Sequence, residues 1–151
     1  MRMAWYLGLA GLIPFAMGLF IVLTSPGGVL FVGPSRLVGS QVLLSYGAII
    51  LSFMGAIHWG AGMEREPDRA WPYAVSVIPA LFAWGFWGLS LLNPEAAPLV
   101  MVALALGFVG LLIFDVVRAA AGDFPSWYPR LRLILTSGAA GALLIAGFYS
   151  T

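Results

Sequence analysis

Four ionisable residues of this chain lie where long apolar segments begin or end. His58, the only histidine, closes the run YGAIILSFMGAIHWG, and Asp115 lies three residues before Arg118 at the end of another apolar run. Arg132 lies near the start of a third run. Histidine exchanges a proton near neutral pH, and a carboxylate can pair with it or with a guanidinium. These four residues are the candidate polar or ligand-binding site.

Two interpretations of this site stay open at the level of sequence. In the first, the residues join neighbouring helices, and their charges extend toward the lipid headgroups. In the second, His58 and Asp115 bind a proton, a quinone head group or a polar solute. Both interpretations predict that His58 and Asp115 lie within reach of one another, directly or through a water or an arginine, because an unpaired carboxylate in a bilayer is costly.

Other reactive motifs are missing from the sequence. One histidine and no cysteine exclude an HExxH motif, a thiol nucleophile and a tetrahedral metal site within one chain. Met54 and His58 are one helical turn apart, but they would need a second chain to complete a metal site. The acidic and basic residues of the segment EREPD (64–68) are interpreted as solvated. We therefore predict no catalytic residue, no metal and no cofactor.

The composition places the chain in a membrane. Of its 151 residues, 62% are hydrophobic and 9% are charged, whereas a soluble domain carries about 25% charged residues. So little charge cannot cover a water-facing surface, and the lipid bilayer is the predicted partner. A net charge of +1 without a basic run argues against nucleic acid as a partner.

Five stretches are long enough to cross the bilayer, which takes about 20 mostly apolar residues. Turn-forming segments rich in Gly, Pro and Asp separate them. The first stretch exceeds the 7–15 residues typical of a signal-peptide core, so we expect it to stay as a spanning helix. The predicted fold is an all-α bundle of five transmembrane helices in one domain, residues 1–151, with spans at 4–24, 38–63, 73–92, 97–118 and 131–149. Whether residues 25–37 are re-entrant or interfacial stays open.

The arginines predict the orientation of the bundle. Under the five-span arrangement, six of the seven lie on one side, namely Arg2, Arg65, Arg69, Arg118, Arg130 and Arg132, and only Arg36 lies on the other. Short loops that carry excess positive charge face the cytoplasm. The N-terminus is therefore predicted to be cytoplasmic and the C-terminus periplasmic.

Small residues at helical spacing predict where the helices touch. Helices associate in lipid through close backbone approach and interhelical hydrogen bonds, both of which small side chains allow. The predicted packing positions are Gly11, Gly18, Ser52, Gly55, Gly107 and Gly141. Such seams also suit contact with other transmembrane proteins or with a second copy of the chain.

Four segments resemble a known family. They are LGLAGLIPF (7–15), YGAIILSFMGAIHWG (46–60), the pair FD at 114–115 and PSWYPRLRLILTSGA (125–139). The chain is similar here to the small uncharacterised membrane family that includes mitochondrial transmembrane protein 69 and many proteobacterial proteins. The resemblance implies a bacterial inner membrane or mitochondrial-type membrane, of which we take the bacterial inner membrane. It implies no activity.

These observations lead to two functional expectations. The first is a non-enzymatic inner-membrane protein that acts as an accessory, assembly or scaffolding component of a membrane complex. The alternative is a small transporter, channel or quinone-binding protein that uses the site at His58 and Asp115. A polar, water-accessible cavity that reaches His58 would favour the alternative.

Overall fold

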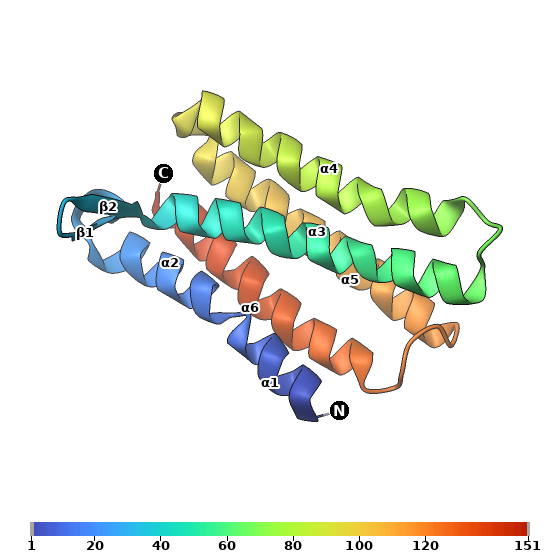
Figure 1. Ribbon diagram of the computed structural model, residues 1–151. Coiled ribbons are helices and arrows are strands. Elements are labelled where there is room, and N and C mark those ends of the chain that lie inside the picture. The colour runs from blue at the N-terminus through green and yellow to red at the C-terminus, as the bar shows by residue number, and fades with distance from the viewer. Residues whose placement is uncertain (1, 151) are drawn as a thin grey trace.

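The structure, a computed structural model, describes residues 2–150 and consists almost entirely of helices that lie side by side (Figure 1). Five helical segments are long and apolar enough to cross a membrane, which confirms the predicted fold class. Two short 3-10 turns occupy Pro26–Gly28 and Pro94–Ala96. The other elements are α1 (Arg2–Ala10), α2 (Ile13–Thr24), β1 (Val29–Val32), β2 (Ser35–Val38), α3 (Gly39–Arg65), α4 (Trp71–Leu92), α5 (Ala97–Ala120) and α6 (Tyr128–Tyr149).

Proline marks the start of four helices. It occupies the first or second position of α2, α4, α5 and α6, as Pro14, Pro72, Pro98 and Pro129. A helix leaves its first backbone N–H groups unpaired, so a residue that lacks this group costs nothing there. The observed helices therefore begin close to the predicted spans, although α6 begins at Tyr128, three residues before the predicted start.

The first span is broken, which the sequence interpretation did not predict. The segment expected as one helix over residues 4–24 divides at Gly11 and Leu12 into α1 and α2. Pro14 cannot donate a backbone hydrogen bond to the preceding turn, so the helix restarts here. The α2 helix contacts α3 and α6, whereas α1 contacts α6 and diverges from α3 (Figure 1).

The segment after α2 forms a β-hairpin at one end of the bundle (Figure 1). Strands β1 and β2 pair antiparallel, with Val29 opposite Val38 and Val32 opposite Ser35. Gly33 lies in the turn with φ of 60°, a conformation that glycine adopts without strain. The hairpin exposes 72% of Phe31. This segment is neither a helix nor a simple loop, and it provides the connection from α2 to α3.

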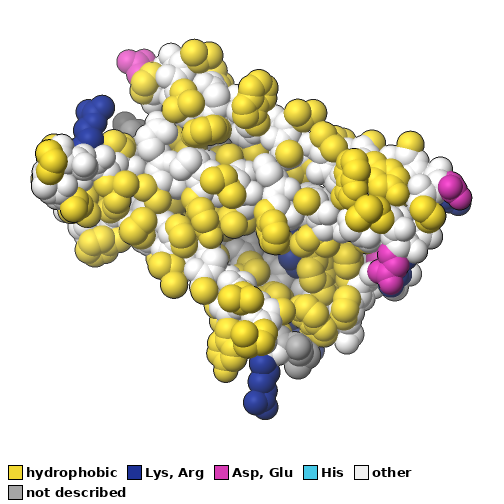
Figure 2. All heavy atoms as spheres, in the orientation of Figure 1, with side chains coloured by type: hydrophobic (Ala, Val, Ile, Leu, Met, Phe, Trp, Pro, Cys, Tyr) yellow, Lys and Arg dark blue, Asp and Glu magenta, His cyan; other side chains and the backbone are white. Residues whose placement is uncertain are grey.

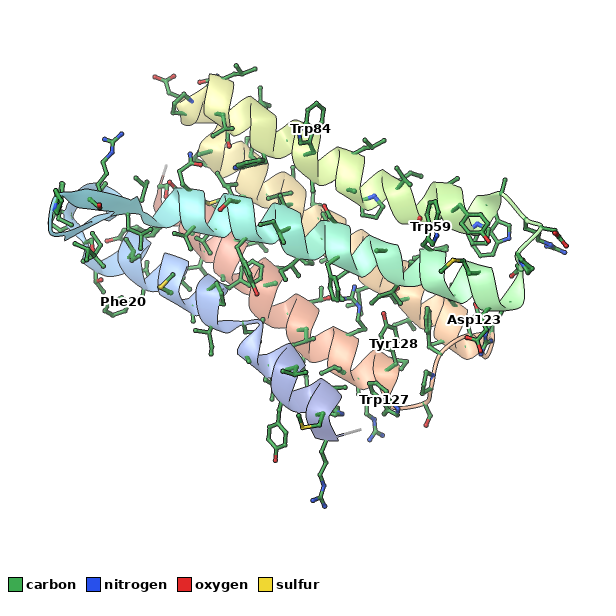
Figure 3. The ribbon with its side chains drawn as sticks, viewed as in Figure 1. Phe20, Trp59, Trp84, Asp123, Trp127 and Tyr128 are labelled. Carbon is green, nitrogen blue, oxygen red and sulfur yellow. The ribbon has the colours of Figure 1, made fainter. Side chains whose placement is uncertain are left out.

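Apolar side chains fill the interior and also cover the outside. The core lies between α2, α3, α5 and α6 and includes Phe15, Leu43, Leu51, Leu104, Phe108 and Leu143. Trp84 and Phe20 point away from the bundle (Figure 3), and they are 70% and 64% exposed. Figure 2 shows hydrophobic side chains along the whole visible face, while most charged side chains gather at the two ends. This distribution is that of a protein surrounded by lipid.

Three of the glycines predicted at packing positions lie against a neighbouring helix. A Cβ atom on Gly55 would lie 2.7 Å from the carbonyl oxygen of Ser76 on α4, closer than packed atoms approach. A Cβ on Gly107 would lie 2.8 Å from Leu51 on α3, and one on Gly18 would meet α3 as closely. These helices touch where glycine lets their backbones approach.

The other three predicted packing positions, of which Gly141 is contradicted, have different surroundings. A Cβ on Gly141 would meet no atom within 4 Å, so the prediction is wrong for this residue. Gly11 lies in the break between α1 and α2, where a Cβ would first meet the carbonyl oxygen of Gly8 on its own helix. The Ser52 hydroxyl donates to the carbonyl oxygen of Ala48 at 2.8 Å, within α3, and thus makes no interhelical hydrogen bond. Helical spacing alone did not identify which small residues face a neighbour.

Candidate functional site

Three helices bring a carboxylate, an imidazole and a guanidinium together inside the bundle. His58 of α3, Asp115 of α5 and Arg132 of α6 are 3%, 0% and 2% exposed. His58 Nε2 lies 2.8 Å from Asp115 Oδ1, which confirms their predicted proximity. Arg132 Nε donates to Asp115 Oδ2, and the hydroxyl of Tyr128 donates to the same oxygen at 3.3 Å. We call His58, Asp115, Tyr128 and Arg132 the buried polar cluster.

The donors around Asp115 define the hydrogen-bonding roles in this cluster. An ionised carboxylate only accepts hydrogen bonds, so His58 donates through Nε2. The Phe114 and Phe124 rings meet the imidazole edge-on, at centroid distances of 4.9 and 5.7 Å. Arg132 Nη1 donates to the sulfur of Met54. A buried ion pair is tolerated in apolar surroundings when additional hydrogen bonds satisfy it in this way.

The structure changes the membership of the candidate site. Arg118, predicted as a member, does not contact Asp115 and belongs to a second group of charges near the loops. Tyr128 was not among the predicted site residues, yet its hydroxyl bonds to Asp115. Met54 was considered only as half of a metal site, and its sulfur accepts a hydrogen bond instead. The spacing of Met54, one turn before His58, was the available signal that the two share a face.

The second group of charges ties the α3–α4 loop to the α5–α6 loop. Arg118 Nη2 donates to Glu66 Oε1 at 3.2 Å, and Arg118 Nε pairs with Asp123, which Figure 3 marks beyond the end of α5. The Arg118 guanidinium also lies 4.4 Å from the centre of the Trp71 ring. Arg65 Nη1 donates to the carbonyl oxygen of Gly122 at 2.7 Å. We call Arg65, Glu66, Trp71, Arg118 and Asp123 the loop network.

Glu66 is held in its charged form by this network. Trp71 Nε1 donates to Glu66 Oε2 at 3.0 Å, and this hydrogen bond lowers the pKa of Glu66 below its ordinary value of 4.5. Arg118 and Arg69 act in the same direction, while partial burial opposes them. The expectation that the segment EREPD is simply solvated is therefore wrong for Glu66. Within residues 2–150, no group of three His, Asp or Glu side chains is placed to hold a metal ion.

A cavity of about 520 Å³ adjoins the buried polar cluster. It lies between α1, α2, α3 and α6, where the break after α1 separates that helix from α3. Among the described residues that line the cavity, Arg132 is the only charged one, and most of the others are aliphatic or aromatic. Figure 2 shows a hollow on this face, surrounded by hydrophobic side chains, with a small patch of basic atoms visible inside it.

Two buried polar atoms of residues that line the cavity lack a hydrogen-bond partner among the described residues. They are Arg132 Nη2 and Thr136 Oγ1, and both are buried. The two residues are one turn apart, so they lie on the same face of α6. Buried polar atoms in proteins are nearly always hydrogen-bonded, and an exception calls for an explanation such as a bound molecule.

The loop side of the cluster is closed. The space bounded by His58, Arg65, Glu66, Trp71 and Arg118, among others, amounts to about 10 Å³. That volume is at or below what a single water needs. The polar, water-accessible cavity that was expected to favour transport through His58 is therefore not found in the described part of the chain. The larger cavity reaches the cluster from the α1 and α6 side, at Tyr128 and Arg132.

Comparison with known proteins places the chain in a family. Transmembrane protein 69 of Xenopus tropicalis is 38% identical over 148 residues, covering 93% of this chain and 52% of its own length. Transmembrane protein 69 of Mus musculus is 29% identical over 137 residues, covering 88% of this chain and 50% of its own. The chain thus spans about half the length of these curated relatives, and no solved structure matches it. The model of the family described as "Protein of unknown function (DUF3429)" matches residues 1–148, and the chain belongs to this family of multi-spanning membrane proteins.

Proposed function

We propose that the protein binds a small lipophilic molecule in the cavity between α1, α2, α3 and α6. The observation that carries this proposal is the pair of buried polar atoms without partners, Arg132 Nη2 and Thr136 Oγ1, on residues that line a mostly apolar cavity. Ligand sites are typically cavities of 300–1,000 Å³ with apolar walls and a few polar groups that orient the ligand. A volume of about 520 Å³ lies within this range.

The walls favour a ligand that is dissolved in the bilayer over a water-soluble solute. A solute that sheds its hydration needs many polar partners, and the cavity offers Arg132, Thr136 and the hydroxyls of Tyr46 and Tyr128. On the loop side, the space next to His58 holds no more than about 10 Å³. Membrane lipids, by contrast, meet apolar helices on the outer surface of the bundle. These walls favour the quinone-binding form of the alternative expectation over a channel.

The buried polar cluster would then have a positioning role. Asp115 holds the Arg132 side chain through Nε, and His58 and Tyr128 hold Asp115 in turn. With its other end bonded to Met54, the guanidinium has little freedom to rotate away from the cavity wall. A donor that is already oriented binds a ligand with a smaller loss of conformational entropy.

We place the protein in the bacterial inner membrane with a cytoplasmic N-terminus. The support is the arginine distribution, with six of seven on one side, since short cytoplasmic loops carry such an excess. In this orientation the loop network lies on the cytoplasmic side and the hairpin on the periplasmic side. The cavity then extends inward from the cytoplasmic boundary at Trp127, which Figure 3 marks at the start of α6.

The accessory or scaffolding role has a separate supporting observation. A Cβ atom on Gly85, Gly88, Gly110 or Gly141 would meet nothing within 4 Å, so these glycines are open at the bundle surface. Small residues let another helix approach closely in lipid. Chemical cross-linking in native membranes tests this role. A cross-linked partner lost on changing Gly88 to Leu would support it, and an unchanged pattern would argue against it.

A co-purification experiment tests ligand binding. Ala4 lines the cavity and Ala10 of the same helix does not, so Ala4→Phe and Ala10→Phe form a matched pair. Both variants and the parent protein are purified in a mild detergent, and the bound lipophiles are quantified by mass spectrometry. We expect one molecular species to accompany the parent and Ala10→Phe and to be depleted in Ala4→Phe. Equal amounts in all three samples would contradict the proposal.

A further inference from the structure

The donors at the cavity wall indicate which kind of head group fits there. Arg132 uses Nε for Asp115 and Nη1 for Met54, which leaves the N–H groups of Nη2. Thr136 adds a hydroxyl without a partner one turn further along α6. A guanidinium only donates hydrogen bonds. The matching head group is therefore a hydrogen-bond acceptor.

The charges around the cavity indicate that this acceptor is neutral. The positive charge of Arg132 is compensated by Asp115, which it contacts directly. His58 bonds to the other oxygen of Asp115 and is not among the cavity's lining residues, while Tyr128 donates its hydroxyl hydrogen bond to Asp115. No second charged residue lines the cavity in the described chain. An anionic head group would add an uncompensated charge in apolar surroundings, whereas a neutral carbonyl would not.

The shape and walls of the cavity suit a planar head with an apolar extension. The lining residues on α6 run from Tyr128 to Ala139, which corresponds to about 16 Å at 1.5 Å per residue. Rings from four helices contribute to the wall, among them Phe15, Tyr46, Phe53 and Phe108. Aromatic side chains pack favourably against a flat conjugated ring.

We propose that the ligand is a quinone-type molecule, with an uncharged carbonyl head at Arg132 and Thr136 and an apolar tail along the cavity. This inference rests on the proposed function, since it names the chemical class bound at the same site. No redox step is part of it. The carbonyl oxygen accepts from Arg132 Nη2 and from the Thr136 hydroxyl, and the tail stays in contact with aliphatic side chains that border the bilayer.

Binding of decylbenzoquinone in phosphatidylcholine nanodiscs tests this inference. Trp127 lines the cavity, so quenching of tryptophan fluorescence, corrected with empty nanodiscs, reports occupancy. Thr136→Val removes the hydroxyl and keeps the shape of the side chain. Losing one neutral hydrogen bond should weaken binding roughly two- to tenfold. Thr24→Val, on the exposed end of α2 outside the cavity, is the matched control and should bind as the parent does.

A second measurement uses the parent protein alone and separates the inference from the proposed function. Nanodiscs that also contain cardiolipin, an anionic lipid, should leave the quinone affinity unchanged. If cardiolipin or palmitate binds in place of the quinone, the preferred head group is anionic and the quinone inference is overturned. The proposed function, binding of a lipophilic molecule in the cavity, would still hold. Quinone binding that is insensitive to Thr136→Val would overturn the placement of the head group. If none of these amphiphiles binds saturably, the proposed function itself fails.

Discussion

Replacing Asp115 with Asn is the most informative perturbation of the buried polar cluster. The change keeps the size and one carbonyl oxygen of the side chain but removes the charge that compensates Arg132. Asp115 is 0% exposed and Arg132 is 2% exposed, so the guanidinium that is left behind stays buried without its compensating charge. Removing one partner of such a pair costs about 3–5 kcal/mol in the free energy of unfolding. We expect the loss in the free energy of unfolding caused by Asp115→Asn to lie in this range.

The double variant Asp115→Asn/Arg132→Gln tests whether the uncompensated charge of Arg132 causes the loss of stability in Asp115→Asn. It leaves two neutral amides in place of the ion pair, and each lost hydrogen bond costs about 1 kcal/mol. The double variant should therefore be more stable than Asp115→Asn alone, although it carries one more substitution. Unfolding in mixed micelles with increasing dodecyl sulfate measures both free energies, and Glu64→Gln at the exposed end of α3 serves as a control. Strictly additive losses from the two substitutions would refute this reasoning.

Three further predictions concern the rest of the bundle. A reporter fused in the loop 64–69 should be cytoplasmic and one fused at the C-terminus periplasmic, and finding both on one side would contradict the assigned orientation. Gly55→Leu should lower thermal stability in detergent, because its Cβ would already meet the neighbouring helix at 2.7 Å, while Gly141→Leu should not. Because its folded-state pKa is lowered, Glu66 should contribute stability above pH 4.5, and this contribution should be lost as the pH falls through that lowered value. The Glu66→Gln variant should lack this pH dependence in thermal melts, and an unchanged profile would contradict it.

The spans were predictable because the length of an apolar stretch can be read directly from the sequence. The proximity of His58 to Asp115 followed from their similar depth in the membrane. Which arginine pairs with Asp115 could not be predicted from depth in the membrane. Arg118, one turn from Asp115 on the same helix, reaches past the helix end to Glu66, and Arg132 arrives from another helix instead. That outcome depends on distances between helices, which spacing along one helix does not contain.

The cavity also lay beyond sequence reasoning. Pro14 lies within the predicted first span, but a proline alone does not say whether the chain kinks, restarts or straightens. The packing of α1 on α6 sets the direction in which α1 diverges from α2. That direction determines the volume left between α1 and α3. Gly33 and its neighbouring turn residues are typical of a chain reversal. The two short strands on either side could not be recognised from the sequence, because the whole segment is apolar.

The most direct test of the central claim is an experimental structure of the protein in nanodiscs made from its native membrane lipids. We propose that the cavity beside Arg132 holds a lipophilic ligand. We predict non-protein density in the cavity between α1 and α3, with a head group within hydrogen-bonding distance of Arg132 Nη2 and Thr136 Oγ1. A cavity closed by α1, with Nη2 bonded to another group of the protein and no such density, would contradict it.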